Sequence, residues 1–466
     1  MGRAGEGRLL WVLPASILAL ALIKGLVWTL ALPPWYGPDE PSHFAYVQML
    51  AVEGRVPHFA APRDDGRDVP ADIQCSEHNM GFRLNGPFFA EPPFGPDPAR
   101  CNQPDTPASQ RPEVPTSSSA GYSPLYYAAG VPFYDLVKNA PVETRLQAVR
   151  LLSVLLGVAA AGFAYLAGFW AFDRRRVLAA ATAVVATLQP MASQQFAIVN
   201  NDALLIAAGA AFFWRFFRAL RRGMGWRDTV WMAALVGLAY LAKPQGAFLA
   251  PLVLIPLWLT RHEHAWPSLL LRAGLFAALL GGVVVLGIVG NLILQGQAVP
   301  QVAQPVTGTY GLRGYVHELI HDQFTHLYWL LVVSAWGHFV WVSAALPPPT
   351  FTVIFAVYLL ALAGVIRAAL SRRPQVIVMV SALLSVLVVG ALLIGLEALL
   401  FRKSGALILQ GRSFLELLPA VAVVIVGGLV ALLPRGCERA GAAAVALAAL
   451  ALNVFSLMVL LETLFG

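Results

Sequence analysis

Long apolar stretches alternate with short polar segments along most of this chain. A helix that crosses a membrane needs about 20 mostly apolar residues, and several stretches approach or exceed that length. The eleven candidates are residues 9–33, 149–172, 177–196, 203–220, 229–242, 244–260, 273–293, 351–370, 375–399, 414–434 and 441–463. The fifth and sixth are short and meet at AKPQG, so a hairpin that does not fully cross is an alternative there. The pattern predicts an all-α polytopic membrane protein, because a helix satisfies its own backbone polar groups in lipid.

The predicted spans divide the chain into five parts. Residues 1–33 contain the first span, residues 34–148 form a long polar loop, and residues 149–293 contain spans two to seven. Residues 294–350 form a second loop, and residues 351–466 contain the remaining spans. The second loop ends in LYWLLVVSAWGHFVWVSAALPP, whose Trp, His and Gly content favours a helix lying at the membrane interface. A twelfth span is the alternative.

Composition and charge agree with a membrane protein and predict its orientation. The chain is 58% hydrophobic and 12% charged, with a mean hydropathy of +0.68. The net charge of +7 does not indicate a nucleic-acid partner, because most Lys and Arg lie in short loops such as DRRR, RALRRGMGWR, SRR and RGCER. Together with Arg3 and Arg8 these loops fall on one side. The positive-inside rule predicts that this side is cytoplasmic and that both long loops are extracytoplasmic.

Two acids stand at the end of the first span, in PDEPSHF. Pro41 suits the first turn of a helix, and we expect a short helix over 41–53 that ends at Gly54 and lies along the outer membrane surface. The helix N-terminus favours the ionised form of Asp39 and Glu40, and ionised carboxylates can act as a general base or bind a metal. His43 lies beside them. The alternative is that Asp39 caps the helix and Glu40 is only solvated.

Two further polar segments come to the same predicted face of the membrane. VNNDALL begins the fourth span, so Asn201 or Asp202 could cap it, and Asp202 should lie at the depth of Asp39. YSPLYYAAGVPFYDL, residues 122–136, reads as a second interfacial helix with Tyr126 and Tyr127. Its tyrosines could form an aromatic belt or stack on a sugar.

Cations on the outer side break the topology rule. Lys243 lies between the fifth and sixth spans, and Arg402 and Arg412 lie in RKSGALILQGRSF. They suggest a bound anion, and phosphate suits Arg through paired hydrogen bonds; lipid head groups are the alternative. Lys24, inside the first span, could pair with Glu397 or Glu416.

The three cysteines divide between the two sides. Cys75 and Cys101 lie in the first outer loop, where a disulfide between them would close a loop of about 25 residues and stabilise the fold by about 3 kcal/mol. Two free thiols are the alternative. Cys437 lies in a predicted cytoplasmic loop.

Several segments in order resemble a known family. PDEPSHF, SPLYY, NND, LAKPQG, SAWGHFVWVSAALP and LQGR resemble the bacterial polytopic membrane proteins catalogued as domain of unknown function 2142, over nearly the whole chain. The chain departs from the family's usual FWG-x-FGW form at Ala335, His338 and Val340, and has Ser413 where an aromatic residue is usual. That family is similar to glycosyltransferases of the GT-C fold.

The resemblance implies a fold and an activity. The fold would be a GT-C-like bundle of about eleven transmembrane helices, with a large first extracytoplasmic loop bearing juxtamembrane helices. The enzyme would sit in the bacterial plasma membrane and move a sugar from a polyprenyl-phosphate-linked donor to a glycan, lipid or protein acceptor of the cell envelope, with inversion. Whether a divalent metal (Mg, Mn or Ca) takes part is an open question.

The residues then take the following expected roles. Asp39 is the general base, Glu40 a metal or hydroxyl ligand beside it, and Asp202 a second candidate metal ligand. The other substrate-binding candidates are His43, Tyr126, Tyr127, Asn201, Lys243, His338, Arg402 and Arg412. The alternative function is an ion-coupled transporter or lipid flippase, in which the outer carboxylates bind a coupling ion. The absence of an inverted repeat and the clustering of charge outside the midplane weigh against it.

Overall fold

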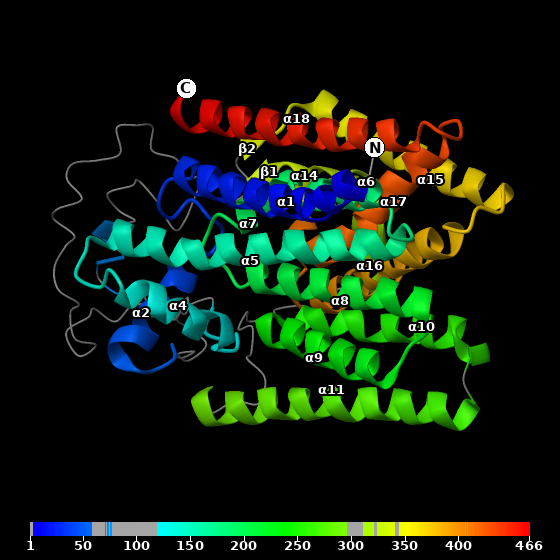
Figure 1. Ribbon diagram of the computed structural model, residues 1–466. Helices are drawn as coiled ribbons and strands as arrows, with labels where there is room; N and C mark the ends of the chain where they lie inside the picture. The colour runs from blue at the N-terminus through cyan, green and yellow to red at the C-terminus, as the bar shows by residue number, and fades with distance from the viewer. Residues whose placement is uncertain are drawn as a thin grey trace.

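The computed structural model of the chain is a bundle of long helices lying roughly side by side (Figure 1). It describes residues 3–57, 70, 72–73, 75–76, 119–263, 265–295, 311–320, 324–340, 344–405, 407 and 409–466. In this part, eight helical segments are long and apolar enough to cross a membrane. They lie in α1 (Arg3–Ala31), α5 (Val142–Ala171), α8 (Asp202–Arg222), α11 (Trp266–Gln295), α15 (Pro348–Leu370), α16 (Val376–Ser404), the joined η6 (Gly411–Leu417) and α17 (Leu418–Ala431), and α18 (Glu438–Phe465).

The other three predicted spans are shorter elements. They are α6 (Arg176–Thr187) followed by α7 (Pro190–Gln195), α9 (Trp226–Ala242), and η3 (Pro244–Val253) followed by α10 (Leu254–Leu259). The chain turns back at Lys243, so α9 and η3 form the hairpin that AKPQG suggested. The prediction of an all-α membrane bundle is confirmed.

The second loop contains short elements and no helix of membrane length among its described residues. They are α12 (Leu312–Ile320), α13 (Phe324–Tyr328), the π-helical η5 (Trp329–Val333), α14 (Ser334–Trp336) and a hairpin of β1 (His338–Phe339) with β2 (Ala344–Ala345). At 1.5 Å per residue, the helical run over 324–336 is about 20 Å long, which is shorter than a hydrocarbon core of about 30 Å. This length favours a loop over a twelfth span.

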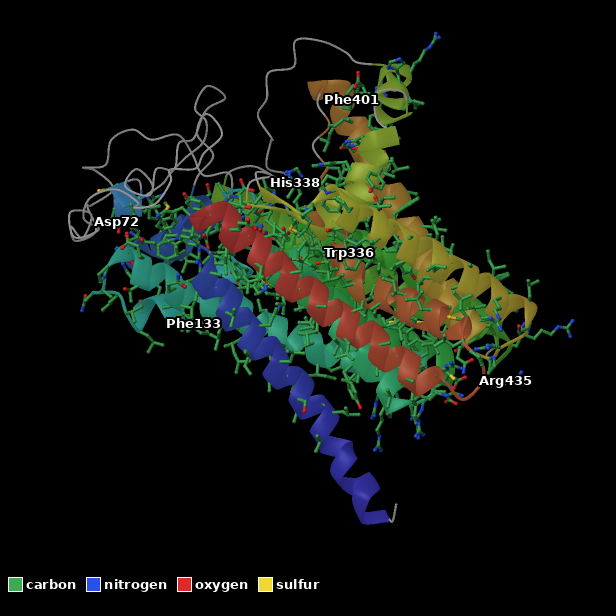
Figure 2. All side chains as sticks on the ribbon, turned by 90° about the horizontal axis from the view of Figure 1, so that it is seen from above. Asp72, Phe133, Trp336, His338, Phe401 and Arg435 are labelled. Atoms are coloured by element: carbon green, nitrogen blue, oxygen red, sulfur yellow. The ribbon has the colours of Figure 1, made fainter. Side chains whose placement is uncertain are left out.

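Two short helices lie at one end of the bundle, which we call the site end. They are α2 (Glu40–Glu53) and α4 (Leu125–Asp135), at the left in Figure 1. As predicted, Pro41 stands in the first turn of α2 and Gly54 ends it in the left-handed conformation, with φ 64°. Figure 2 places Asp72 at the site end and Arg435 at the opposite end.

Helices at the centre and at the edge of the bundle differ in burial. The segment of η6 and α17 is almost wholly buried, whereas the apolar window of α11 at the edge has no buried residue. Glycines allow the closest packing: a Cβ atom at Gly364 of α15 would collide with the carbonyl of Gly428 on α17. Gly411 and Arg412 begin η6, which continues directly into the buried α17. The Gly411–Arg412 segment therefore connects the core of the bundle to the site end.

Candidate active site at the end of the bundle

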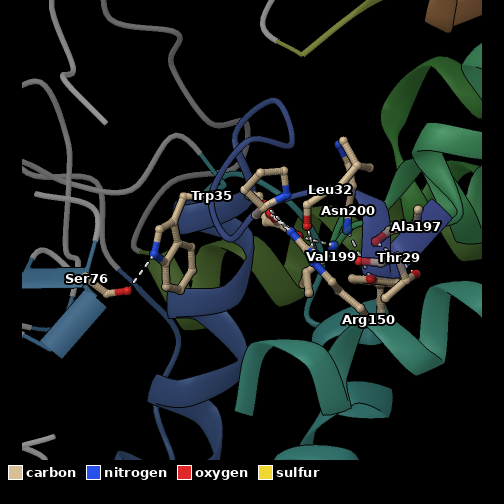
Figure 3. Close-up of polar contacts among 11 residues, drawn as sticks. Thr29, Leu32, Trp35, Ser76, Arg150, Ala197, Val199 and Asn200 are labelled. Carbon is tan, nitrogen blue, oxygen red and sulfur yellow. Dashed lines mark hydrogen bonds and ion pairs between the residues drawn. The ribbon is translucent and has the colours of Figure 1, made fainter. Parts of the chain in front are cut away.

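A buried arginine fixes the loop that carries the two acids. Arg150 of α5 is fully buried and binds both carboxylate oxygens of Glu40, with Nε to Oε1 at 2.8 Å and Nη2 to Oε2 at 2.7 Å. It also donates to the carbonyls of Thr29, Leu32 and Pro33 at the end of the first span (Figure 3). The backbone N–H of Val199 donates to the same carboxylate at 3.0 Å. Arg150 therefore joins α1, α2 and the segment before α8.

These contacts give Glu40 a structural role. Its side chain is 0% exposed, and each of its oxygens accepts a hydrogen bond from Arg150. A metal or a substrate hydroxyl would have to displace a buried ion pair, which is costly. The expected role of Glu40 as a catalytic residue and ligand is therefore not supported, and the residue instead holds Asp39 in place.

Four charged residues meet beside this loop. Asp39 Oδ2 lies 3.3 Å from Arg412 Nη2, and Asp202 Oδ1 lies 2.7 Å from Lys243 Nζ. The two ion pairs form one cluster, because Arg412 also interacts electrostatically with Asp202. We call these four residues the charged cluster. The sequence pattern predicted that Asp202 lies at the same membrane depth as Asp39, and the structure brings both acids together with two of the three outer cations.

The members of the charged cluster differ in accessibility. The Asp39 side chain is 35% exposed and Arg412 is 17% exposed, whereas Asp202 is only 3% exposed. Asp39 has φ 60° and ψ 9° and precedes the first turn of α2, and its carboxylate accepts no capping hydrogen bond from the helix. Burial disfavours the charge on Lys243, but the Asp202 carboxylate outweighs it and raises the pKa of Lys243. Asp39 is thus the more accessible of the two acids in the charged cluster.

His43 and the buried tyrosines Tyr46, Tyr126 and Tyr127 form a layer of aromatic side chains next to the charged cluster. His43 Nδ1 is hydrogen-bonded to Tyr127 Oη at 2.8 Å, and its ring lies nearly parallel to the rings of Tyr122 and Tyr127. Burial lowers the pKa of His43 to about 4, so the imidazole is neutral at pH 7. Tyr46 covers Tyr127 at a ring distance of 3.9 Å, and Tyr126 Oη is hydrogen-bonded to Ser153.

These contacts change the expected roles of the tyrosines. Tyr126 is 1% exposed and Tyr127 is 0% exposed. Their rings are covered by other side chains, so neither a sugar platform nor a lipid-facing belt fits them. They support the cluster from behind, and the half-buried Tyr122 is the aromatic residue that interacts electrostatically with Lys243 and Arg412.

Asn201 also forms its side-chain hydrogen bond within the protein. Its side-chain N–H₂ donates to the carbonyl of Ala242 at 2.7 Å, which ties the start of α8 to the end of α9. It stands at the N-cap position without a side-chain cap bond. Because Lys243 follows Ala242 directly, this bond places Lys243 opposite Asp202. Asn201 is therefore a residue that positions the cluster.

A large apolar groove adjoins the charged cluster. It has a volume of about 520 Å³ and runs between the second loop, α15, α16, η6 and α17. Its polar lining residues are few, and Gly411, which precedes Arg412, lines one end. A Cβ atom at Gly411 would collide with the backbone of Ala335. Gly411 therefore packs closely against the second loop, and because Arg412 follows it directly, the groove ends beside the charged cluster.

Comparison of the sequence with known families decides what kind of protein this is. The family described as "Predicted membrane protein (DUF2142)" matches residues 22–421. The chain belongs to the DUF2142 family. No curated protein gives a significant match to this DUF2142 protein.

Solved structures show the fold of the DUF2142 protein. ArnT from Cupriavidus metallidurans bound to undecaprenyl phosphate matches at a TM-score of 0.52 and 14% identity, over 97% of this chain and 76% of that one. The apo form of the same protein matches at 0.49 and 13%, over 99% and 78%. The apo oligosaccharyltransferase of Archaeoglobus fulgidus matches at 0.47 and 13%, over 97% and 56%. The match to ArnT in the bound form confirms the predicted GT-C fold.

Among the described residues, the DUF2142 protein gathers no group of three or more His, Cys, Asp or Glu side chains that could hold a metal. Glu40 is bound to Arg150 and Asp202 to Lys243. Residues 317–321 read HELIH and match the HExxH pattern of zinc hydrolases. His317 is exposed on α12 and His321 lies outside the described residues. The described residues therefore do not fit a resident metal ion.

Two predicted cations of the DUF2142 protein lie apart from the cluster. Arg402 is exposed near the end of α16 and forms no ion pair with a described residue; its neighbour Phe401 lies near the end of α16, where its ring packs against Tyr315 of α12 (Figure 2). Lys24 is buried with its Nζ over the ring of Phe196 at 5.4 Å. It pairs with neither Glu397 nor Glu416 in the described structure, so that expectation was wrong.

The cysteines are described only in part. Cys75 is disulfide-bonded and Cys437 is a free, exposed thiol. Cys101 lies outside the described residues, so its pairing with Cys75 stays a prediction.

His338 and some polar residues absent from the expectations line a small pocket beside Arg412. Trp329 Nε1 donates to His338 Nδ1 at 3.2 Å. Gln194, Gln195 and Gln410 line the same pocket. The available signal was the run of amides in QPMASQQF, which is unusual inside an apolar stretch. Arg150 was also missed, because nothing local marks an arginine as the partner of Glu40.

Proposed function

We propose that this DUF2142 protein is a glycosyltransferase that moves a sugar from a polyprenyl-phosphate-linked donor to a cell-envelope acceptor. The observation that carries this proposal is the junction of the charged cluster and the apolar groove at Gly411–Arg412. A polyprenyl-phosphate donor has the same division, with an anionic head and a long apolar tail. An apolar site with a few placed polar groups is typical of ligand binding.

The similarity to ArnT supports the donor class. That protein is described as bound to undecaprenyl phosphate. At 14% identity the similarity concerns the fold, so the proposed chemistry of this chain rests on its own side chains.

Asp39 is the proposed general base. An acceptor hydroxyl gives its proton to the Asp39 carboxylate as its oxygen forms a bond to the anomeric carbon. The bond from that carbon to the phosphate oxygen breaks, and its electron pair leaves with the phosphate. One displacement inverts the anomeric configuration. Asp202 is less suited to this step because its side chain is 3% exposed and bound to Lys243.

Arg412 and Lys243 are the proposed partners of the leaving phosphate. Negative charge that develops on the phosphate is stabilised by cations that are already fixed in place. Arg412 is suited to this contact because its side chain is 17% exposed in the charged cluster and the residue directly follows Gly411, which lines the apolar groove. No step is assigned to a metal, since Asp39, Asp202 and Glu40 each pair with a cation of the protein.

We also propose that the site end faces the extracytoplasmic side of a bacterial plasma membrane. The excess of positive residues at the opposite end, around Arg435, supports this orientation. The acceptor would then be a glycan, lipid or protein outside the cytoplasm.

A transfer assay tests the proposal. Purified protein in detergent is supplied with undecaprenyl-phosphate-linked hexoses and envelope glycolipids, and release of undecaprenyl phosphate is measured. Asp39→Asn should fold and bind the donor but lose transfer by roughly a hundredfold or more, the usual scale for a general base. Asp135→Asn is the matched control, because Asp135 is an exposed acid at the site end.

Near-normal transfer by Asp39→Asn would remove Asp39 from the chemistry. A protein that turns over none of these donors, yet takes up solute into proteoliposomes in an ion-dependent way that Asp39→Asn abolishes, would favour the transporter function.

A further inference from the structure

A small pocket lies between α7, the second loop and the Gln410–Arg412 segment. Its volume is about 10 Å³, and its lining includes Pro38, Gln194, Gln195 and Arg412. This volume accommodates one oxygen atom of the size of water. Pro38 directly precedes Asp39, so the pocket borders the Asp39–Arg412 ion pair.

Three buried polar atoms of the lining residues have no hydrogen-bond partner in the described structure. They are Gln194 Nε2, Gln195 Oε1 and Arg412 Nη1. Both glutamine side chains are fully buried. Gln194 Oε1 accepts from the backbone N–H of Val340 at 3.0 Å, which fixes its Nε2 as the unpartnered donor. Gln195 Nε2 lies 3.8 Å from Met191 Sδ, which leaves its Oε1 as the unpartnered acceptor.

Two donors and one acceptor are the complement of a hydroxyl group. A hydroxyl has one O–H to donate and two lone pairs that accept. A phosphate or carboxylate oxygen has no proton for Gln195 Oε1, and an ammonium group has no lone pair for Gln194 Nε2. Leaving such atoms unpaired in the interior costs about 1–3 kcal/mol each, so a ligand that satisfies all three gains specificity.

We propose that Gln194, Gln195 and Arg412 seat one hydroxyl group of the sugar that the donor carries, and so select the sugar. The inference rests on the proposed function and names a specificity site for it. The donor is favoured over the acceptor because the pocket lies on the Arg412 side, next to the end of the apolar groove. The attacking acceptor hydroxyl must instead face the exposed Asp39 carboxylate.

The test combines changes in the protein with changes in the donor. The probe is an undecaprenyl-phosphate-linked hexose that the wild-type protein accepts, together with each of its single-deoxy analogues. In the wild type, loss of the seated hydroxyl should lower kcat/KM by roughly a hundredfold or more, since a site built to bind a hydroxyl rejects the analogue without it. In Gln195→Leu and Gln194→Leu the same loss should change kcat/KM by less than about threefold, because the two losses are not additive.

Gln189→Leu is the matched control. Gln189 is also buried, but its amide is bound within the protein, to Ala192 and Ala335. This variant should lose thermal stability and keep the wild-type ranking of deoxy donors.

Several outcomes overturn the inference. If Gln195→Leu lowers kcat/KM equally for every deoxy donor and lowers the thermal midpoint, the pocket holds a structural water. If the non-additivity appears with deoxy acceptors instead, the site selects the acceptor. If the wild type turns over no polyprenyl-phosphate-linked sugar, both the proposed function and this inference are wrong. If it transfers the sugar, but the glutamine substitutions and the loss of each donor hydroxyl have additive effects, only this inference is wrong.

Discussion

At the scale of single residues, the adjacent acids Asp39 and Glu40 have opposite surroundings. Asp39 keeps 35% of its side chain exposed, whereas Glu40 is 0% exposed against Arg150. Asp39 precedes α2 in a left-handed conformation and points to Arg412, and Glu40 begins the helix on the side of α5. One residue of backbone therefore separates a group that can react from one that holds the loop.

His43 makes stability depend on pH. Burial lowers its pKa to about 4 from an ordinary value of 6.5, against the opposing effect of Asp39 and Asp202. Between these values the unfolded chain binds a proton that the folded protein does not, so the free energy of unfolding falls as pH decreases from about 6.5 to about 4. The loss over the whole window is on the order of 3 kcal/mol.

The measurement is the thermal unfolding midpoint in detergent at about pH 7 and about pH 5. The wild-type midpoint should fall more than that of His43→Gln. Equal falls in both proteins would contradict a buried neutral imidazole at this position.

Arg412 should matter for phosphate binding and Arg402 should not. Arg412→Gln removes a charge-assisted hydrogen bond, so affinity for undecaprenyl phosphate should fall by one to two orders of magnitude, or about 1.5–3 kcal/mol. Arg402→Gln is the control, because Arg402 is exposed and outside the cluster. The check is binding of undecaprenyl phosphate in detergent, and similar losses in both variants would indicate a diffuse charge effect.

At the scale of elements, one side chain connects three segments. Arg150 extends from α5 to the carbonyls of Thr29 in α1 and Leu32 just after it. It also binds Glu40 at the start of α2, and Glu40 in turn accepts from the backbone N–H of Val199 before α8. These segments carry Asp39 and Asp202. The buried Arg150–Glu40 ion pair therefore helps to fix the relative positions of the two acids.

Breaking that pair should unfold the site end. Arg150→Met leaves Glu40 buried without a partner and should cost about 3–5 kcal/mol of stability, and Glu40→Gln in the same protein should recover part of it. Arg175→Met is the control, because its ion pair with Glu438 is 45% and 30% exposed and such pairs contribute about 0–1 kcal/mol. Thermal unfolding in detergent measures both; a loss no larger for Arg150→Met than for Arg175→Met would refute the role of Arg150.

At the scale of the whole molecule, the charged cluster and the free thiol lie at opposite ends of the bundle. Cys437 is exposed beside Arg435, which Figure 2 places far from Asp72. If the site end is extracytoplasmic, a membrane-impermeant maleimide should label Cys437 only after the membrane is permeabilised. Cys75 should not react, because it is disulfide-bonded. Labelling of Cys437 in intact cells would reverse the predicted orientation.

The sequence alone determined the class of the protein, its α-helical bundle and the residues from which the charged cluster is drawn. Apolar length and the sign of charges in loops are local properties, so they can be read along the chain. The pattern also placed Pro41 and Gly54 at the two ends of α2. It could not separate eight long helices from shorter ones, since a short apolar element and a full span have the same composition.

Only the tertiary structure decided which groups meet. Asp39 and Arg412 are 373 positions apart and Glu40 and Arg150 are 110 apart, and no local pattern fixes such pairs. Burial then separates the candidate residues: Tyr126, Tyr127 and Glu40 are buried against the protein itself, whereas Arg402 is exposed and lies outside the charged cluster. Gln194 and Gln195 line the same small pocket as Arg412. The physical reason is that the cost of charge and of an unpaired polar atom depends on the surrounding packing, which exists only after the helices have assembled.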